Sequence, residues 1–499
     1  MGSYAIAVFD VGKTNKKLLI YSEELELLDS VYRSFPVRVE GGVEVEPIDE
    51  VELWLVENLR RFAGAYAIRV VSVTTHGASF VGVDAAGEQS MPMLSYTHEP
   101  GDAFHEEFYN LVGERGELQR RTATMDLGAL INPAKGIYFC RKHYPEAFER
   151  TAHILFFPQY WGFRMTGEVA ADYTYAGCHT YLWDFERWDW SHVADTLGIR
   201  EKLPQRIGRS WDLLGTITED FAEKSGLHPD TVVTLGIHDS NSSLLPYLIK
   251  KKDEDFVLNS TGTWCVAMHP TDTVAFAEDE IGKSVFFNIS AFGTPVKTTL
   301  LAGGLEFETY TEILKSIGST PQLPDYNRPL YKRLIQERGH FVLPSVLAGT
   351  GQFPSSKPRV VENGAVYHLE EIREGRRIPE FFNDFPAAFA AVNLSLAIQT
   401  EISLKRVGLT DGVSIYTEGG FRNNPDYNAL LTAFFENSPV YLTGMEEATS
   451  FGAALLAKSA QEETPVEGLG ELFEIETQEV RRESFEHLRE YVAAFMEEL

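Results

Sequence analysis

The chain opens with two apolar runs separated by a short polar turn. Residues Ala5–Phe9 are all apolar, Asp10 closes the run, and apolar character returns at Leu18–Tyr21 after a turn that contains glycine, threonine and asparagine. Short apolar runs bounded by such turn residues are typical of β-strands. The pattern therefore predicts a strand, a tight turn and a returning strand near the N-terminus.

The same pattern returns near the middle of the chain. Phe256–Leu258 are apolar, Ser260–Thr263 form the polar turn STGT, and Trp264–Met268 are again apolar. One such hairpin near the start of each half is a weak internal repeat, and it suggests two domains of similar design. We expect the boundary near residues 247–253, where a lysine-rich stretch precedes the second hairpin, which gives domains of 1–247 and 248–499.

Helical spacing fills much of the remaining sequence. Residues Pro47–Gly64 carry apolar side chains at intervals of three and four and stop at glycine, as expected of an amphipathic helix. Further helices are predicted at Asn383–Val407, Tyr427–Phe435 and Gly452–Ala457. Strands that alternate with helices indicate the α/β class.

Length and charge narrow the class of protein. At 499 residues the chain exceeds the ~250–300 residues at which single cores stop growing, which supports two domains. The formal net charge is −29, and such a surface repels a nucleic-acid backbone. We therefore expect no nucleic-acid partner. A small polyanion can still bind where backbone N–H groups, lysines and a metal receive it.

Neither disulfides nor membrane spans are indicated. The cysteines Cys140, Cys178 and Cys265 are far apart and show no CxxC spacing, which argues against a disulfide framework and a zinc site. Asp10 interrupts the N-terminal apolar run, so no signal peptide is expected. The uncharged stretch from Phe385 to Thr400 is shorter than the ~20 residues of a membrane span and is interpreted as a buried helix. A cytoplasmic protein with no membrane partner is expected.

The first hairpin has the composition of an anion-binding turn. Asp10 ends the strand, and Gly12, Lys13, Thr14 and Lys17 follow closely, so backbone N–H groups and positive charge can surround a phosphate. Asp10 could hold Mg²⁺ through water. The GKT sequence at 12–14 is not a Walker A loop, because Ala7 stands where the first glycine is required and a strand follows. An ordinary structural hairpin is the alternative.

Two further segments carry a carboxylate or an imidazole next to an apolar run. Asp239 follows the apolar run Val232–Ile237 and precedes small polar residues. It is either a helix N-cap or a carboxylate that accepts a proton from a substrate hydroxyl. His76 and Gly77 follow a strand-like run, where a single histidine is more often structural than functional. Local sequence favours the structural interpretation for both segments.

The last glycine-rich segment lies close to the C-terminus. Gly419-Gly420 follow a strand-like run and permit close approach of the backbone to a ligand, and Asn423-Asn424 could hydrogen-bond to it. A plain glycine turn between a strand and a helix has the same composition, so the segment alone is ambiguous.

The two hydroxyl-rich hairpins could clamp the phosphates of one nucleotide from opposite sides.

The order of these segments resembles that of the FGGY carbohydrate kinases. DxGxTxxK at 10–17, THG at 75–77, GxxD ending at 239, STGTW at 260–264, GGxxNN at 419–424 and ExxxxGAA at 447–454 span almost the whole chain. The resemblance implies an α/β protein of two actin-like ATPase (ribonuclease H-like) domains with a central cleft. It also implies transfer of a phosphoryl group from ATP, with Mg²⁺, to a hydroxyl of a small sugar. The alternatives are an ATPase of the same fold and a sugar-binding regulator without kinase activity.

The resemblance also implies roles for individual residues. It makes Asp239 the catalytic base, and it puts Asp10 and Asp239 near the metal. The implied sugar contacts are His76, Gly77, His238 and Asp239. The implied ATP contacts are Asp10, Gly12, Lys13, Thr14, Asn15, Lys17, Thr261, Gly262, Thr263, Gly419, Gly420 and Asn424.

Two departures from the family pattern bear on the substrate. Lys13 stands where many members have a second threonine, and residues 95–102 read SYTHEPGD in place of the family's tryptophan-aspartate-arginine stretch. Sugar contacts of xylulose or glycerol kinases therefore do not transfer. His238-Asp239, STGTW and the proline soon after the acid are most similar to rhamnulose kinases. The expected substrate is a ketose of the rhamnulose, fuculose or xylulose type, in particular a 6-deoxyketose. A homodimer is compatible with this assignment.

Overall fold

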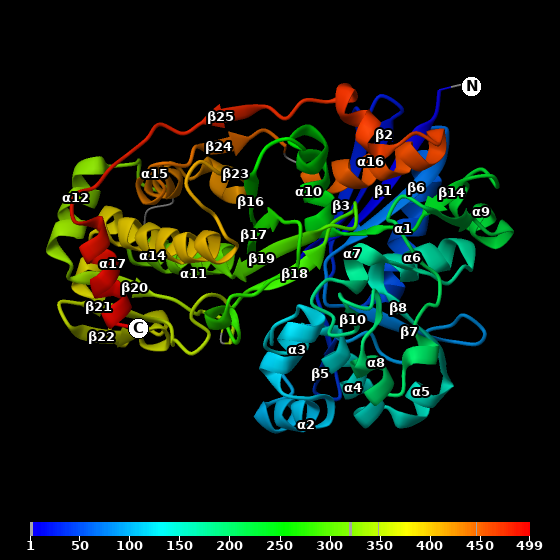
Figure 1. Ribbon diagram of the computed structural model, residues 1–499, viewed down its shortest axis with the longest axis horizontal. Coiled ribbons are helices and arrows are strands. Elements are labelled where there is room, and N and C mark those ends of the chain that lie inside the picture. The colour runs from blue at the N-terminus through cyan, green and yellow to red at the C-terminus, as the bar shows by residue number, and fades with distance from the viewer. Residues whose placement is uncertain (1–2, 319–321, 348, 446) are drawn as a thin grey trace.

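A computed structural model describes residues 3–318, 322–347, 349–445 and 447–499. Within these residues the chain forms two lobes that lie side by side (Figure 1). Each lobe is built around a mixed sheet of seven strands, with helices packed on it. The predicted α/β class is confirmed.

The sheet of the first lobe has the order β13-β14-β6-β1-β2-β3, with β15 beside β6. Its strands are β1 (Ala5–Val11), β2 (Asn15–Ser22), β3 (Leu27–Ser34), β6 (Ile68–Thr75), β13 (Leu213–Thr216), β14 (Val232–Thr234) and β15 (Ile237–His238). The first predicted hairpin is formed by β1 and β2, in which Asp10 pairs with Lys17. Strand β6 runs parallel to β1.

The second lobe repeats this arrangement in a sheet of order β18-β19-β17-β16-β23-β24-β25. Its strands are β16 (Phe256–Thr261), β17 (Cys265–Pro270), β18 (Phe286–Ile289), β19 (Pro295–Leu301), β23 (Ser414–Gly419), β24 (Val440–Thr443) and β25 (Thr477–Glu479). The second predicted hairpin is formed by β16 and β17. Strand β23 runs parallel to β16, as β6 does to β1. The two lobes therefore share one design, as the repeated hairpin predicts.

Helices and short strands complete both lobes. The helices of the first half are α1 (Ile48–Ala63), α2 (Asp102–Val112), α3 (Arg115–Thr122), α4 (Pro133–His143), α5 (Pro145–Arg150), α6 (Phe157–Thr166), α7 (Tyr173–Ala176), α8 (His192–Thr196), α9 (Glu219–Ser225) and α10 (Asp239–Lys250). Those of the second half are α11 (Gly303–Gly318), α12 (Arg328–Glu337), α13 (Leu369–Arg373), α14 (Phe385–Arg406), α15 (Pro425–Phe434), α16 (Ala448–Glu462) and α17 (Leu488–Glu497). Small sheets are made by β4 (Arg38–Glu40) with β5 (Val43–Val45), β7 (Phe80–Asp84) with β8 (Thr151–Phe156), β9 (Ala171–Asp172) with β12 (Ile207–Gly208), β10 (Trp183–Asp184) with β11 (Asp189–Trp190), and β20 (His340–Leu343) with β21 (Arg359–Glu362) and β22 (Ala365–His368).

The predicted helices are present, and one of them starts earlier than predicted. Helices α1, α14 and α15 closely match the predicted ranges. Helix α16 begins at Ala448, so the prediction that Gly452 opens it is wrong. A Cβ on Gly452 would lie 1.9 Å from the carbonyl oxygen of Ser242 in α10. The glycine is required because α16 and α10 cross closely, not because a helix begins there.

Helix α16 packs on the sheet of the first lobe, and helix α10 packs on the sheet of the second lobe. Alternate residues of a strand face opposite sides of its sheet. On β1, Phe9 packs with Trp54 of α1 and Trp161 of α6, whereas Val8 packs with Leu455 of α16. Helix α16 comes from the second half of the sequence, yet it covers one face of the first sheet. Helix α10 lies beside α16 and packs against the second sheet. The expected boundary between residues 247 and 248 falls within α10.

One described helix, α14, is long and apolar enough to cross a membrane by length and composition alone. Of its apolar window, 94% is buried inside the protein. The interpretation of this stretch as a buried helix is therefore confirmed.

Candidate active site

Strand ends of the first sheet bring four polar residues together. Strands β1 and β15 both pair in parallel with β6, so their carboxyl ends meet at one edge of the sheet. Asp10 lies near the end of β1, His76 directly follows β6, and His238-Asp239 form the junction of β15 and α10. In open α/β sheets this edge is where ligands bind.

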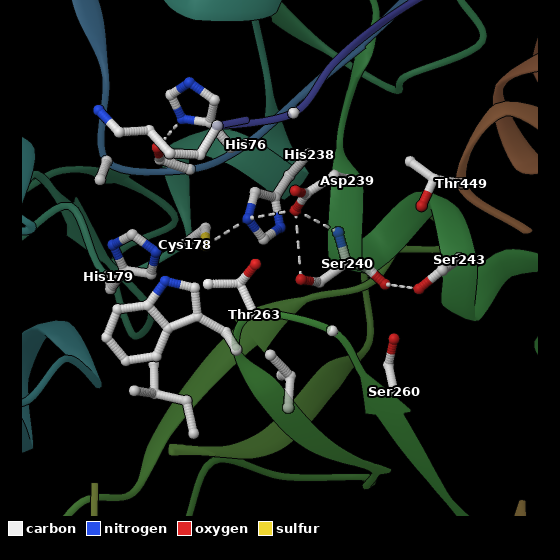
Figure 2. Close-up of a pocket in the computed structure, with 18 of the residues that line it drawn as sticks. His76, Cys178, His179, His238, Asp239, Ser240, Ser243, Ser260, Thr263 and Thr449 are labelled. Carbon is white, nitrogen blue, oxygen red and sulfur yellow. Dashed lines mark hydrogen bonds and ion pairs between the residues drawn. The ribbon is translucent and has the colours of Figure 1, made fainter. Parts of the chain in front are cut away.

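A cavity of about 440 Å³ opens between the two hairpins, within the ~300–1,000 Å³ range of small-molecule sites. Both lobes line it. The predicted site residues that line it are Asp10, Gly12, Lys13, Thr14, Asn15, Lys17, His76, Gly77, His238, Asp239, Thr261, Gly262 and Thr263. Figure 2 shows Asp239 of the first lobe in the same space as Ser260 and Thr263 of the second hairpin.

Asp239 does not have the geometry of a helix cap. Its Oδ1 accepts the backbone N–H of Ser240 at 2.6 Å and the Ser240 hydroxyl at 3.2 Å. The same oxygen lies 3.2 Å from Nε2 of His238. An N-cap side chain instead accepts from the second or third N–H of the helix. All of these contacts involve Oδ1, which leaves Oδ2 available to a ligand in the cavity.

The two carboxyl groups of the cavity titrate above their ordinary range. Burial raises the pKa of Asp239 to about 6. Burial also raises the pKa of Asp10 to about 7, where the charge of Lys17 opposes the shift and that of Asp239 adds to it. Two carboxylates that face one cavity and repel each other suit a hard divalent cation, which prefers oxygen ligands. The residues present therefore fit Mg²⁺.

Two lysines of the first hairpin, Lys13 and Lys17, have different partners. Nζ of Lys17 lies 2.7 Å from Oε2 of Glu447 at the start of α16 and 3.8 Å from Oδ2 of Asp10. Nζ of Lys13 instead donates to the buried carboxylate of Glu46. The charge of Lys13 is thus already compensated within the first lobe, whereas Lys17 links the first hairpin to α16.

His76 is a neutral imidazole with one free nitrogen. Its Nδ1 donates to the carbonyl oxygen of Gly77 at 2.8 Å. Its Nε2 is buried and has no partner among the described residues. Burial, followed by the charge of Lys16, lowers the pKa of His76 well below its ordinary value. The Nε2 lone pair can therefore accept a hydrogen bond from a hydroxyl.

Sequence analysis overlooked Lys16, which lies beneath the first hairpin turn. Its side chain is almost completely buried. Its Nζ donates to the carbonyl oxygens of Gly12 and Lys13, both at 3.0 Å. These two bonds fix the turn in the conformation that faces the cavity. The alternation of a strand put Lys16 inward and Lys17 outward, but a buried lysine is too rare to be expected from sequence.

We expect Lys16→Met to destabilise the protein and to weaken ATP binding. The substitution keeps the apolar stem but leaves two turn carbonyls without their donor, a loss of about 1–3 kcal/mol. Chemical denaturation would measure the free energy of unfolding, and titration with ATP its affinity. Lys142→Met is the control, because Lys142 pairs with Glu107 on the surface, where ion pairs contribute about 0–1 kcal/mol. Equal effects of the two substitutions would contradict this role of Lys16.

Three predicted ATP contacts do not line the cavity. Asn424 caps α15 by accepting the backbone N–H of Tyr427, and its amide donates to Asn393 at 2.7 Å. Gly419 and Gly420 lie behind the second hairpin, where Gly419 pairs with Thr261. These residues therefore sit next to the second hairpin and not on the cavity surface.

One wall of the cavity is apolar, and sequence analysis did not identify it. It comprises residues of both lobes: Ala78, Ile131, Trp264, Val266, Phe286 and Leu300. They belong to one small apolar cluster. Next to it, the backbone N–H of Phe287 donates to the carbonyl oxygen of Ala123 at 2.9 Å. The lobes are thus joined at this wall by main-chain and apolar contacts, which no local motif signals.

Family models match both halves of the chain. The model "FGGY family of carbohydrate kinases, N-terminal domain" matches residues 5–246. The model "Carbohydrate kinase FGGY, C-terminal domain" matches residues 253–465. Residues 247–252, at the end of α10 and in the loop after it, lie between the two matches.

Curated relatives match part of the chain at modest identity. L-fuculokinase of Escherichia coli K12 is 27% identical over 203 residues, which are 40% of this chain and 41% of that protein. Rhamnulokinase of Halalkalibacterium halodurans is 22% identical over 268 residues, which are 52% of this chain and 55% of that protein. The chain thus spans about half the length of the curated relatives it matches.

Solved structures share the fold over the whole chain. A carbohydrate kinase from Novosphingobium aromaticivorans has a TM-score of 0.76 at 24% identity and covers 100% of this chain and 99% of its own. Plasmodium falciparum glycerol kinase with ADP has a TM-score of 0.78 at 15% identity and covers 99% and 97%. The predicted pair of actin-like ATPase domains is therefore confirmed. With both halves matched by its models, the chain belongs to the FGGY family of carbohydrate kinases.

Proposed function

We propose that the protein is an ATP-dependent kinase that phosphorylates a hydroxyl of a small ketose. The observation that carries the proposal is the carboxylate of Asp239. It faces a cavity lined by both hairpins, it does not cap its helix, and burial raises its pKa to about 6. A general base needs a pKa near the operating pH and a free oxygen within reach of the proton it accepts.

The residues of the hairpins and strand ends have separate roles in this proposal. Asp239 takes the proton of the attacking hydroxyl, while His76 and His238 orient the sugar. Lys17 and the N–H groups of both hairpins face the phosphates, where positioning and charge stabilisation supply most of the catalysis. Mg²⁺ held by Asp10 and Asp239 would neutralise charge on the phosphate oxygens. In this assignment residues 1–247 bind sugar and phosphate and residues 248–499 bind the nucleotide, with Gly419 and Gly420 toward adenosine.

Within this proposal the preferred sugar is a 6-deoxyketose. The two curated relatives are named for fuculose and rhamnulose, and both of these sugars carry a methyl group in place of a hydroxyl. The apolar wall at Ile131, Phe286 and Leu300 offers such a methyl group the contact that a hydroxyl would not gain there. The polar groups of His76, His238 and Asp239 line the same cavity and can receive the hydroxyl groups of the sugar.

A panel of sugars with a readout of ADP release tests this function. We expect ATP turnover that depends on sugar, with rhamnulose and fuculose ahead of xylulose and glycerol. ATP turnover indifferent to every sugar would identify an ATPase of the same fold. Sugar binding by calorimetry without any ADP release would identify a regulator.

We expect Lys17→Ala to raise the KM for ATP, lower kcat, or both, with little change in sugar affinity. The reason is its location between Asp10 and Glu447, on the phosphate side of the cavity. Initial rates at varied ATP and varied sugar would separate the two effects. Lys13→Ala is the matched control, since Glu46 already neutralises that lysine and its effect on ATP should be smaller. Unchanged ATP kinetics in Lys17→Ala would exclude Lys17 from the phosphate site.

A further inference from the structure

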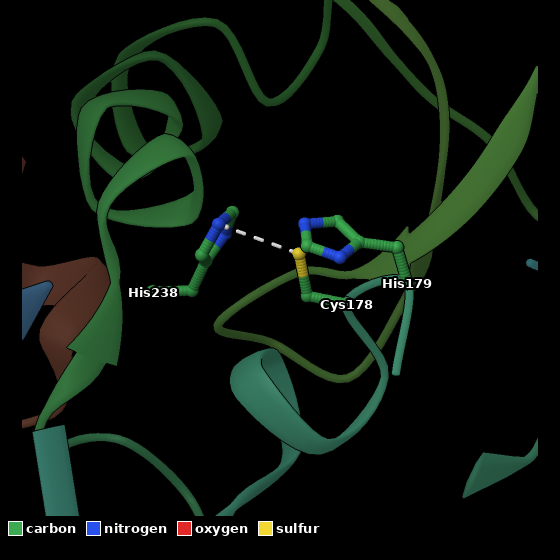
Figure 3. A group of neighbouring side chains, drawn as sticks. All are labelled: Cys178, His179 and His238. Atoms are coloured by element: carbon green, nitrogen blue, oxygen red, sulfur yellow. Dashed lines mark hydrogen bonds between the residues drawn. The ribbon is translucent and has the colours of Figure 1, made fainter. Parts of the chain in front are cut away.

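Three potential metal ligands gather on one side of the cavity, away from the phosphate side. Cys178 Sγ lies 3.3 Å from His238 Nε2. The side chain of His179 approaches from the other side, and the ligand atoms of all three residues lie within 4.8 Å of one another. All three side chains are buried. Figure 3 shows the sulfur and both rings directed toward a common space.

The backbone around the cluster leaves room for that convergence. A Cβ on Gly77 would lie 2.8 Å from Nε2 of His179 and 2.9 Å from Nε2 of His238. Both imidazoles therefore point the same nitrogen at one spot above Gly77. His179 has a φ of 39°, a left-handed conformation that non-glycine residues seldom adopt and that is often retained at functional sites.

Polar atoms behind the cluster lack partners. Nδ1 of His179 is buried without a partner in the described part of the chain, and so is Oδ1 of Asn241. The amide nitrogen of Asn241 lies 3.3 Å from Nδ1 of His238. The two ends of an amide are assigned from such contacts and are not observed directly. With the amide turned over, Oδ1 would accept a hydrogen bond from the N–H at Nδ1, the support that metal-bound histidines usually have.

We propose that Cys178, His179 and His238 bind one zinc ion. Zn–S and Zn–N bonds of about 2.3 and 2.0–2.1 Å in a tetrahedral site put neighbouring ligand atoms roughly 3.3–3.6 Å apart. The Cys178–His238 pair already has this spacing, and His179 needs only a small shift. A thiolate with two imidazoles is a donor set that zinc prefers over Mg²⁺. The thiol proton of Cys178 is released to solvent when the ion binds.

The fourth position of this site opens into the cavity, next to Asp239. An ion bound there occupies space assigned above to the sugar, and its charge stabilises the Asp239 carboxylate and weakens it as a base. Zinc should therefore inhibit competitively with the sugar and not with ATP. This consequence rests on the proposed function, whereas binding of the ion does not.

Cobalt is the probe that tests the site, because Co²⁺ replaces zinc and a thiolate ligand gives it a near-ultraviolet charge-transfer band. Titration of the unliganded full-length protein with Co²⁺ should produce this band and saturate at one ion per chain, and Zn²⁺ should abolish it. Cys178→Ser should lose the band. Cys140→Ser should keep it, because Cys140 is an equally buried thiol in α4, outside the cavity.

A second variant keeps the test decisive if Cys178→Ser folds poorly. His179→Gln retains the thiol but removes one metal ligand. It should weaken Co²⁺ binding by more than the roughly 10–100-fold typical of substitutions in residues that only hydrogen-bond to a ligand. Absence of the band in the wild-type protein, or its persistence in Cys178→Ser, would overturn the site. Because no sugar or ATP is present, a failure of the kinase assignment would leave this result unaffected.

Discussion

Replacing Asp239 by asparagine should lower kcat by about 10²–10⁴-fold while the fold and ATP binding survive. The substitution keeps the size of the side chain and removes its ability to take a proton. The bonds from Ser240 to Oδ1 can be retained by the amide oxygen. Sugar-dependent ADP release measures kcat, and thermal unfolding with and without ATP measures the fold and the nucleotide affinity.

Asp172→Asn is the matched control for this substitution. Asp172 is also buried, and burial likewise raises its pKa to about 6. Unlike Asp239, it caps its helix, by accepting the backbone N–H groups of Thr174 and Tyr175. Asparagine can still cap a helix, but Asp172 also accepts from Gln159 Nε2 on Oδ1 at 3.0 Å and from Ser210 Oγ on Oδ2 at 2.9 Å. Because asparagine keeps only one acceptor oxygen, Asp172→Asn should lower thermal stability without a comparable loss of kcat. If Asp239→Asn keeps more than about a tenth of the wild-type rate, against the 10²-fold minimum expected of a lost base, Asp239 has only a structural role.

Gly419→Ala should reduce the free energy of unfolding by about 2–5 kcal/mol. Gly419 has φ 77° and ψ −152°, a region that is essentially restricted to glycine. A Cβ there would also lie 1.9 Å from the carbonyl oxygen of Thr261. That oxygen belongs to the backbone of the neighbouring strand and cannot move without displacing the second hairpin. Thermal unfolding should show a decrease in Tm of roughly 5–15 °C.

Gly412→Ala separates the two causes of this loss. Gly412 also has a positive φ, of 90°, but a Cβ there would meet nothing within 4 Å. Gly412→Ala should lower the free energy of unfolding only by the cost of a positive φ for alanine, about 1 kcal/mol. A Gly419→Ala protein as stable as Gly412→Ala would show that the close approach of β23 to β16 is not rigid. In that case the second hairpin would tolerate displacement, and its assigned contact with phosphate would lose its structural basis.

The hairpins could be predicted because all of their determinants are local. Asp10, the small residues after it and the apolar run at Leu18–Tyr21 suffice to define a strand, a turn and a return. Gly452 shows the opposite case. Local sequence suggested a helix start, whereas its actual role depends on Ser242, a residue of another helix far away in the sequence. Packing between distant elements leaves no local signal.

Some residues of the candidate site could likewise be identified from local sequence, and others could not. Residues that follow strand ends, such as Asp10, His76 and Asp239, could be identified from their position after apolar runs. The partner of Lys13 could not, because four strands, β2 to β5, separate Lys13 from Glu46 in the sequence. Cys178 and His179 come from a loop after the short helix α7, and only the folded chain brings them to His238. Their spacing in the sequence matches no metal motif, so sequence analysis argued against zinc.

The covering of the first sheet by α16 has a consequence for biosynthesis. Strands β1 and β6 are synthesised long before α16, yet one apolar face of their sheet is covered by Ala453 and Leu455 of that helix. That face remains exposed until translation has passed Glu462, the last residue of α16. Nascent chains with uncovered apolar surface are prone to aggregate and depend on chaperones. The first lobe thus becomes a fully packed domain only after α16 has been synthesised.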